Sequence, residues 1–176
     1  TFPSQPADQA FYLLSRPLKT MTVGIGNNSV LQCSTPANST NVIQVAAGGM
    51  HSLAVKADGS VIAWGDNTYG KCNVPTDLSG AVQVGAGWYH SVALLSNGSV
   101  RAWGLNNHSL GWTYTEVPAL TDAVAVSVQA MHSLALKADG TVVAWGYNSE
   151  FGETNVPPTL SNVIAISAGY RHNLAV

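Results

Sequence analysis

The chain has 176 residues, of which 46% are hydrophobic and only 9% are charged, and its formal net charge is −2. This composition is typical of a globular chain with a large apolar core and a polar rather than ionic surface. The seven Lys and Arg residues are scattered, so nothing predicts a nucleic-acid partner. No apolar run approaches the roughly 18 residues that a membrane-spanning helix needs, so no membrane insertion is expected.

One fifteen-residue sequence motif occurs three times. His51–Gly65 reads HSLAVKADGSVIAWG, and His132–Gly146 repeats it with twelve identities in fifteen positions. A third copy, HSVALLSNGSVRAWG, covers His90–Gly104, and a fourth His-containing segment begins at His172. The spacing of 39 to 42 residues indicates a repeat architecture, in which each unit buries its faces against its neighbours.

The first forty residues are predicted to be a divergent copy of the unit. An ungapped shift of 39 residues superposes several matching positions, namely Gly26, Asn28, Cys33 and Pro36 on Gly65, Asn67, Cys72 and Pro75. The His-Ser pair is missing from this copy, where Tyr12 and Leu13 stand instead. The two cysteines hold equivalent positions in consecutive units, too far apart for a disulfide.

The next unit shows the predicted strands in order. Val42–Ala47 suits an inner strand because it ends in small residues, and His51–Lys56 is a second strand. Asp58-Gly59 predicts a tight hairpin, because both central residues of a type I′ turn need positive φ. Val61–Trp64 returns antiparallel, and a short outer strand closes at Val74-Pro75. Four antiparallel strands in about forty residues predict a β-propeller blade.

The predicted fold is therefore all-β, a β-propeller of four-stranded antiparallel blades with about four repeats and a partial one. All lie in one propeller domain, with units at residues 1–40, 41–79, 80–121 with an enlarged loop, 122–161, and a partial unit at 162–176. Because the chain starts in a decayed unit and stops inside a second strand, we expect these blades to belong to a larger ring. A longer polypeptide or other copies of the chain would complete it. The rival is a four-bladed closure in which Ala165–Val176 pairs with the N-terminal strands.

These repeated motifs resemble the repeats of the regulator of chromosome condensation family. The resemblance is strong over residues 41–176 and weak over residues 9–40. The short blades and the Asn-Val-Pro closers are most similar to its bacterial and extracellular branch, which includes a propeller-type β-lactamase inhibitor protein. The resemblance implies the fold but not one activity, because the family includes exchange factors for a small GTPase, a plant light sensor and protein inhibitors.

No catalytic motif is found in the sequence. It has no paired carboxylates in a shared loop, no nucleophile elbow and no phosphate-binding Gly-Lys-Ser/Thr, so we expect neither an enzyme nor a cofactor. The four histidines recur once per unit, which favours buried ties between blades over a metal site. The repeated Trp64, Trp103 and Trp145 are likewise expected to fill the space between blades.

The loops that vary from unit to unit predict a binding face. Alternating strand direction places the loop after the first strand and the loop after the third strand on one face. Met, Arg and aromatic side chains, which contribute most at protein interfaces, gather in these loops. The first set of loops contains Met50, Trp88, Tyr89, Met131, Tyr170 and Arg171, and the second contains Tyr69, Trp112, Tyr114 and Tyr147.

We therefore expect a non-catalytic protein-binding or structural module. Its partner would be a protein or other propeller segments of the same parent chain. One alternative is a glycan-binding module that uses Trp88, Tyr89 and Trp112 as stacking platforms, and another is an intracellular GTPase-regulating propeller. Low charge and glycosylation acceptors favour an extracellular or cell-surface setting over a cytoplasmic one. These acceptors are Asn27, Asn38, Asn97 and Asn107.

Overall fold

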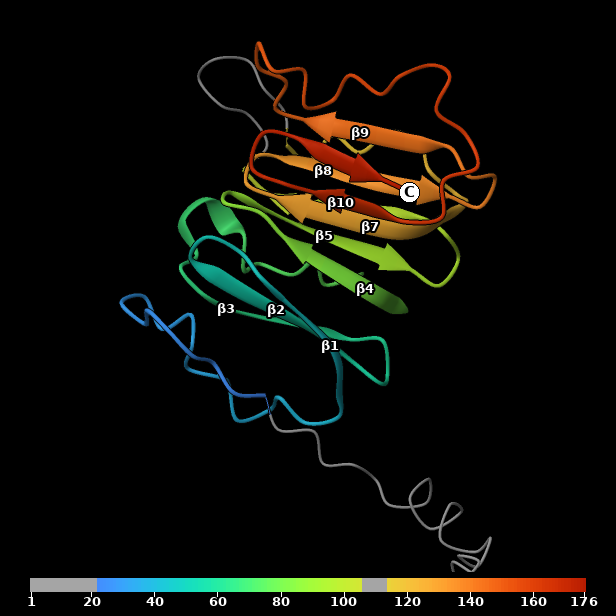
Figure 1. Cartoon of the computed structure of the whole chain (residues 1–176). Helices are drawn as coiled ribbons and strands as arrows, with labels where there is room; N and C mark the ends of the chain where they lie inside the picture. The colour runs from blue at the N-terminus through green and yellow to red at the C-terminus, as the bar shows by residue number, and fades with distance from the viewer. Residues whose placement is uncertain (1–21, 106–113) are drawn as a thin grey trace, which may run out of the picture.

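The computed structural model describes residues 22–105 and 114–176, and it is all-β as predicted (Figure 1). The predicted Trp112 and Asn107 lie outside the described residues. The elements are β1 (Val42–Ala47), β2 (His51–Lys56), β3 (Val61–Gly65), the short 3-10 turn η1 (Thr68–Gly70), β4 (Ala81–Ala86), β5 (His90–Leu95), β6 (Val100–Gly104), β7 (Ala123–Gln129), β8 (His132–Lys137), β9 (Val142–Gly146), β10 (Ile166–Ala168) and β11 (Asn173–Ala175).

The strands form consecutive antiparallel sheets that stack face to face (Figure 1). We call β1-β2-β3 blade 1, β4-β5-β6 blade 2, β7-β8-β9 blade 3 and the two-stranded β10-β11 sheet blade 4. Hairpin turns join the second and third strands as predicted, but they are not of the predicted type I′. Gly59, Gly98 and Gly140 have positive φ between 77° and 79°, whereas Asp58, Asn97 and Asp139 before them do not. In this region side chains other than glycine are strained, which explains why Gly recurs at each turn.

The complete sheets have three strands each, where four were predicted. The expected outer strand that ends at Val74-Pro75 is instead a run of tight turns after β3. Tyr69 and Gly70 have positive φ of 69° and 73°, the Asn73 amide donates to the Gly70 carbonyl, and the Val74 amide donates to the Cys72 carbonyl. These local hydrogen bonds use the backbone groups that a fourth strand would need.

The core lies between the blades rather than within one sheet. Leu53 and Val55 of blade 1 belong to one buried cluster with Val84 and Ala86 of blade 2, and these four side chains are at most 3% exposed. A second cluster joins blades 2 and 3 and includes Trp145, as predicted for the repeated tryptophans. Each blade therefore depends on its neighbours for burial.

Glutamine side chains join the inner strands of adjacent blades. The Gln44 amide accepts from the backbone N–H of Val84 at 2.9 Å and donates to the carbonyl of the same residue at 3.1 Å. Gln83 makes the same two bonds with Val126. At the third interface Ala125 occupies the glutamine position, and Ser127 Oγ instead accepts from the Ala168 amide at 2.9 Å.

Residues 26–33 repeat the geometry that follows the third strand of blade 1. Gly26 has φ of 115°, close to the 102° of Gly65. The Asn28 side chain accepts from the Cys33 amide at 2.8 Å, as the Asn67 side chain does from Cys72 at the same distance. This part of the N-terminal region therefore corresponds to a third strand and its following loop, and both cysteines are free.

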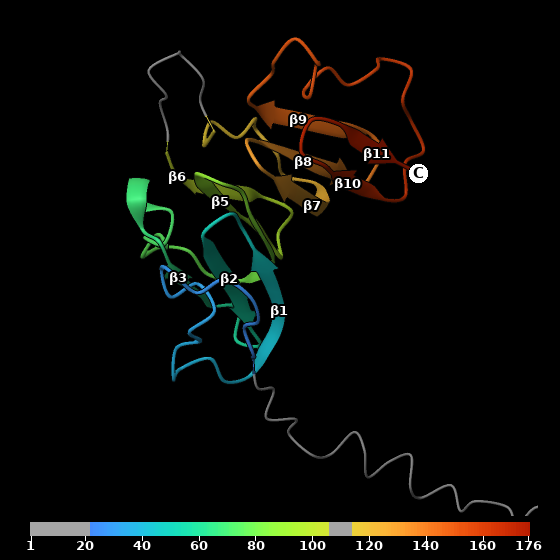
Figure 2. The same ribbon diagram turned by 60° about the vertical axis from the view of Figure 1, so that its left-hand side comes forward.

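The two ends of the described chain lie far apart. The Val176 amide donates to the Ala165 carbonyl within blade 4, and residues 22–40 lie at the opposite end of the stack in both views (Figures 1 and 2). The rival four-bladed closure is therefore not the arrangement of the described residues. In the described ranges, no helix has the length and hydropathy needed to cross a membrane.

Candidate functional site

A buried hydrogen-bond relay fixes each blade against the next. His51 Nε2 lies 2.9 Å from Ser91 Oγ, and Ser91 Oγ donates to the Lys71 carbonyl at 2.8 Å. Because the serine uses its only hydrogen on that carbonyl, it accepts from His51 Nε2–H. Trp103 Nε1 donates to the same carbonyl at 2.9 Å. The Lys71 carbonyl oxygen thus accepts hydrogen bonds from both a serine and a tryptophan of the following blade.

The relay recurs along the stack. Its other members are the Ser52 and Trp64 donors to the Gln32 carbonyl, the His90–Ser133 contact at 2.8 Å, and the His132–Asn173–Glu153 carbonyl chain. Burial lowers the pKa of His51 to about 4 and that of His90 to about 3, so both rings are neutral at neutral pH. These contacts confirm the prediction of buried ties between blades for His51, His90 and His132, whereas the fourth histidine, His172, is exposed. Among residues 22–105 and 114–176 no cluster of potential metal ligands occurs.

Backbone contacts bring the loops after the first strands together on one face. The Gly49 amide donates to the Gly87 carbonyl at 3.1 Å, and the Trp88 amide donates to the Ala130 carbonyl at 2.7 Å. A Cβ atom on Gly87 would lie 2.6 Å from the His90 ring and 2.8 Å from the Ala130 carbonyl oxygen. The close packing of these loops therefore requires glycine and places Trp88 over the neighbouring blade.

Five rings form a continuous aromatic cluster on this face, defined as Tyr69, Trp88, Tyr89, Tyr114 and Tyr170. Tyr89 contacts Tyr69 at 5.7 Å between ring centroids, Trp88 at 6.3 Å and Tyr114 at 6.1 Å. Trp88 also contacts Tyr170 at 5.2 Å, which links blade 2 to blade 4 across blade 3. Tyr69 and Tyr170 remain about half exposed, at 54% and 49%. Such ring pairs hold one another in place, so the cluster presents a preformed surface.

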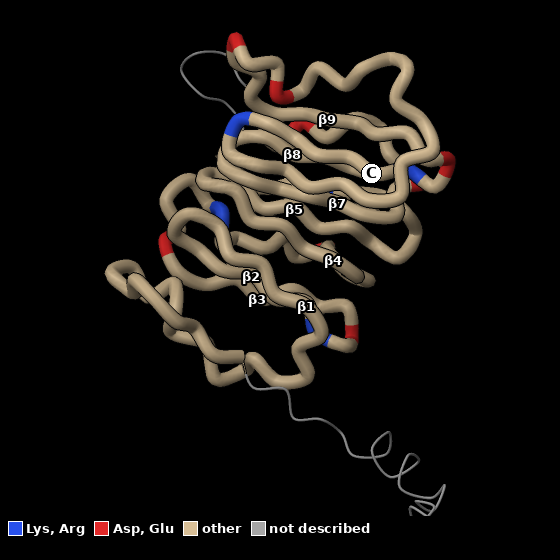
Figure 3. Tube along the Cα trace, in the orientation of Figure 1, with Lys and Arg blue, Asp and Glu red and all other residues tan. Residues whose placement is uncertain are grey.

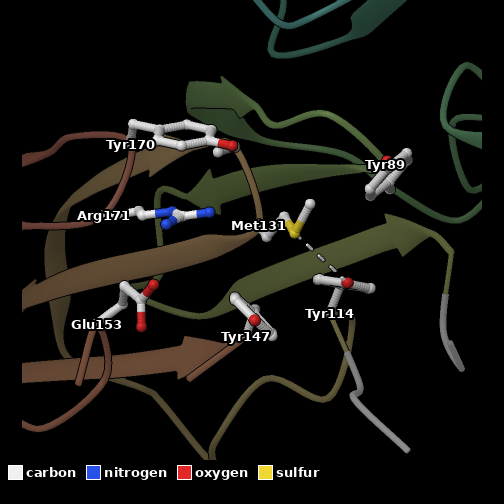
Figure 4. Close-up of a pocket in the computed structure, with 8 residues that line it drawn as sticks. Tyr89, Tyr114, Met131, Tyr147, Glu153, Tyr170 and Arg171 are labelled. Carbon is white, nitrogen blue, oxygen red and sulfur yellow. Dashed lines mark hydrogen bonds between the residues drawn. The ribbon is translucent and has the colours of Figure 1, made fainter. Parts of the chain in front are cut away.

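A tyrosine-lined pocket of about 170 Å³ opens beside the cluster (Figure 4). Its wall consists of Tyr89, Tyr114, Met131, Tyr147, Tyr170, Arg171, Glu153 and Ala130. The Arg171 guanidinium carbon lies 5.0 Å from the Phe151 ring centroid and 5.2 Å from that of Tyr170. In the described part of the chain no carboxylate comes within ion-pair distance of Arg171. Arg171 is exposed, so its charge is available to a ligand.

A wider hollow of about 540 Å³ lies on the other side of Tyr89. It is lined by Gly49, Met50, Asp66, Thr68, Tyr69, Lys71, Trp88 and Tyr89. The buried Lys71 ammonium pairs with Asp66, and this hydrogen bond lowers the pKa of the Asp66 carboxyl to about 2. Because the two charges neutralise each other, the hollow is mainly an apolar surface.

The structure places the described residues of the predicted binding set in the lining of these two hollows, with one correction to their exposure. Tyr114 was predicted as an exposed contact residue, but its side chain is 1% exposed. Its ring stacks on the His90 ring at 5.7 Å between centroids and contacts Tyr89, and it still contributes to the pocket lining. Sequence reasoning missed Lys71 and Glu153, because their burial depends on contacts that no local pattern encodes.

The described glycosylation acceptors Asn27, Asn38 and Asn97 are exposed. Asn97 also has a structural role, because its side-chain oxygen accepts from the amide and the hydroxyl of Ser99 at 3.0 and 2.7 Å. Asp58 makes the same pair of bonds with Ser60 in blade 1. Asn97 therefore stands where the hairpin turn needs an Asn or Asp.

Comparisons with solved structures place the fold among propellers. The chain is 20% identical to Prp20p from Saccharomyces cerevisiae, with a TM-score of 0.65 over 81% of this chain and 44% of that one. Yeast RCC1 (Prp20) in complex with Kap60 is 26% identical, with a TM-score of 0.60 over 80% and 42%. The ectodomain of the Arabidopsis thaliana receptor kinase ACR4 is 22% identical, with a TM-score of 0.60 over 77% and 46%.

The chain thus spans less than half the length of each of these proteins. No curated protein sequence matches the chain significantly. The regulator of chromosome condensation (RCC1) repeat matches residues 42–71, 81–109 and 131–152, which fall on blades 1, 2 and 3 in turn. The blades of this chain are therefore RCC1-type β-propeller repeats.

Proposed function

We propose that this chain is a non-catalytic protein-binding module that uses the face bearing the aromatic cluster. The observation that carries this proposal is the continuous row of rings from Tyr69 to Tyr170, flanked by two hollows. Large rings held by their neighbours lose little conformational entropy on binding, and Trp, Tyr and Arg are enriched among binding hot spots. The repeated turns at the opposite ends of the strands offer nothing comparable.

The chemistry of the face defines the kind of partner. The tyrosine-lined pocket suits an apolar or aromatic anchor, and Arg171 at its rim suits a carboxylate, which guanidinium groups bind well. Lys and Arg are scattered over the described residues without a basic patch (Figure 3), so the partner is not selected by strong charge attraction. We infer a protein segment that combines one apolar anchor with one acidic group.

Two solved structures of one similar protein, yeast Prp20, support a protein partner. Prp20p is described together with its binding to Gsp1p and histones, and yeast RCC1 (Prp20) is seen bound to Kap60. A protein of similar fold thus binds other proteins. A glycan is the rival ligand, because Trp88 and Tyr89 would also stack on sugar rings.

Removing the centre of the aromatic face tests the proposal. Trp88→Ala with Tyr89→Ala should weaken partner binding by at least about 2 kcal/mol, the threshold of a hot spot, while the circular dichroism stays unchanged. Proteins retained from a cell-surface extract by the wild-type chain would be identified, and their affinities measured by calorimetry. A glycan array probed in parallel distinguishes the rival, since binding to sugars alone would contradict a protein partner.

The matched control alters the opposite face. Asp58→Asn with Asp139→Asn keeps the turns intact, because Asn97 already holds the equivalent position in blade 2. Partner affinity should not change in this variant. Loss of binding here, with retention in the Trp88 and Tyr89 double variant, would place the working face at the other end of the strands.

We also propose an extracellular or cell-surface setting for the module. The low content of charged residues supports it, as do the exposed acceptors Asn27, Asn38 and Asn97. Secretion from a eukaryotic host should yield a chain whose mass falls after treatment with an N-glycosidase. A mass equal to that of the bare polypeptide would argue against glycosylation. Asn97→Asp would remove one acceptor and keep the turn.

A further inference from the structure

One position in the loop after each third strand has a fixed backbone and a variable side chain. Its carbonyl accepts from a serine or asparagine of the following blade, as the Gln32, Lys71 and Glu153 carbonyls show. Tyr114 stands at the same place in its own loop, four residues before Pro118, as Lys71 and Glu153 stand before their loop prolines. Lys71, Tyr114 and Glu153 are 3%, 1% and 3% exposed. The hydrogen-bond relay thus anchors the backbone here, while the buried side chain differs from loop to loop.

The loops that contain Lys71 and Glu153 have the same backbone geometry. Gly70 and Gly152, which directly precede the two residues, both have φ of 73°. Each of these glycine carbonyls accepts from the amide three residues later at 3.0 Å. The two loops therefore bury charges of opposite sign at one equivalent position.

The Lys71 charge is neutralised within its own loop, whereas the Glu153 charge is not. The Lys71 ammonium pairs with Asp66, but Tyr147 takes the place of Asp66 in the other loop. The Glu153 carboxylate accepts from the Ser149 amide at 2.7 Å and from the Ser149 hydroxyl at 2.7 and 2.9 Å. Within residues 22–105 and 114–176 no ion pair includes Glu153.

Glu153 is ionised at neutral pH. Burial alone would raise the pKa of its carboxyl, but hydrogen bonds, led by that from the Ser149 hydroxyl, outweigh burial and hold the pKa below its usual value. A buried carboxylate attracts a cation more strongly than an exposed one, because water screens it less. One buried negative charge without a counter-ion therefore stands in the wall of the tyrosine-lined pocket.

Much of the remaining pocket wall is aromatic. Its four tyrosines are Tyr89, Tyr114, Tyr147 and Tyr170. They lie around Met131, with Glu153 to one side (Figure 4). The faces of aromatic rings attract cations, and quaternary ammonium groups bind in cages of such rings. The volume of about 170 Å³ is below the roughly 300 Å³ of the smallest pockets for drug-sized ligands, so the pocket admits the end of one side chain.

The chemistry of this wall favours a methylated ammonium over the ammonium of unmodified lysine. A lysine ammonium has three N–H donors, each of which needs an acceptor when it is buried. The Glu153 oxygens already accept from Ser149, and the Tyr114 hydroxyl donates to the Met131 sulfur at 3.9 Å. A trimethylated ammonium keeps the charge, has no N–H, and contacts rings and a thioether through its methyl groups.

We propose that the tyrosine-lined pocket binds a trimethylated lysine side chain of the partner protein, with Glu153 as the specificity-determining residue. This inference rests on the proposed protein-binding role of the face and identifies its anchor. Arg171 borders the same pocket, but its charge is exposed and screened by water, with its guanidinium carbon 5.0 Å from the Phe151 ring centroid and 5.2 Å from that of Tyr170. The Glu153 charge therefore dominates inside the pocket.

NMR of methionine methyl groups tests this binding on the wild-type chain. The chain has three methionines, of which Met131 lines the tyrosine-lined pocket and Met50 lines the wider hollow. The probes are Gly-Ser peptides that differ in one side chain: lysine, trimethyl-lysine, or an uncharged analogue with carbon in place of the quaternary nitrogen. The trimethyl-lysine peptide should shift the Met131 signal, leave the Met50 signal in place, and bind at least about tenfold more tightly than the other two.

Two variants test the roles of the charge and of the rings. Glu153→Gln keeps an oxygen for the Ser149 hydroxyl, and it should weaken binding of the trimethyl-lysine peptide by about tenfold without affecting the uncharged analogue. Tyr147→Leu removes one ring but keeps an apolar side chain, and it should have the same selective effect. Glu150→Gln is the matched control and should change neither affinity, because it removes an equal charge from the same loop outside the pocket wall.

The outcomes separate this proposal from the proposed function. Equal affinity for trimethyl-lysine and its uncharged analogue would overturn the cation site but would leave an apolar anchor on the same face. A Met131 signal that no peptide shifts would also overturn it, even where the Trp88→Ala and Tyr89→Ala double variant loses its protein partner. Wild-type affinity of a folded Glu153→Gln chain for the trimethyl-lysine peptide would show that Glu153 does not determine specificity.

Discussion

Replacing Trp145 by Ala is expected to lower the free energy of unfolding by about 3–5 kcal/mol, the usual loss for a large-to-small change in a core. Trp145 is 5% exposed and belongs to the cluster that joins blades 2 and 3, so its removal leaves a cavity at the interface of two sheets. Urea unfolding followed by circular dichroism measures the change. Trp103→Ala should behave alike, because Trp103 is 7% exposed and also donates to the Lys71 carbonyl.

Two other tryptophans are the controls for this result. Trp64→Ala should cost less, because Trp64 is only partly buried at the open face of blade 1. Trp88→Ala should cost least, since Trp88 lies on the loop face against Tyr89 and Tyr170. If Trp88→Ala destabilises the chain as much as Trp145→Ala, Trp88 is a core residue and is not free to act as a binding anchor.

Acid should destabilise the fold from about pH 6.5 downward through its buried histidines. His51 and His90 have pKa values of about 4 and about 3 in the folded chain because burial disfavours the charged ring, against about 6.5 when unfolded. Below pH 6.5 the unfolded state therefore binds protons that the folded state does not. Stability should fall by about 1.4 kcal/mol per pH unit for each histidine as the pH decreases from 6.5 toward 4.

The pH dependence of thermal unfolding checks this expectation. Between pH 8 and 7 the melting temperature should be nearly constant, and it should fall steadily from pH 6 to 4. His90→Gln removes one titrating ring while its amide can still donate to Ser133, so this variant should show a shallower fall. An unchanged slope would mean that His90 titrates normally in the folded chain. The pKa values of Asp66 and Asp139 are lowered to about 2, by hydrogen bonds led by those from Lys71 and Thr141, so both titrate below this range.

Strands and turns were predictable because their signals are local. The predicted Val42–Ala47 and His51–Lys56 are the observed β1 and β2. Asp58-Gly59 lies in a hairpin turn as predicted, although only Gly59 has the positive φ that a type I′ turn requires of both residues. The prediction of a fourth strand was wrong because the Asn67 side chain accepts a hydrogen bond from the Cys72 amide. This bond turns the backbone away from the sheet. A side-chain contact of this kind competes with strand pairing and leaves no periodic pattern in the sequence.

The candidate site was predictable in outline only. Variation among otherwise constant repeats located Trp88, Tyr89 and Tyr170 on one face, and the structure brings their rings together. The burial of Tyr114 was not predictable, because it depends on stacking over His90 from a different part of the chain. Contacts between distant segments decide which side chains of a loop face solvent and which support the loop.

The hydrogen-bond relay of histidine, serine and carbonyl affects how a repeat protein of this kind gains units during evolution. Blades 1, 2 and 3 each contain a histidine that reaches the next blade and a serine at the position that receives the preceding histidine, as His90 and Ser91 show. Gene duplication that adds one unit of 39 to 42 residues therefore adds a complete pair of joints and needs no compensating mutation elsewhere. The number of repeat units can therefore change one unit at a time. At the interface of blades 3 and 4, Asn173 takes the place of the serine and still contacts the preceding histidine, His132.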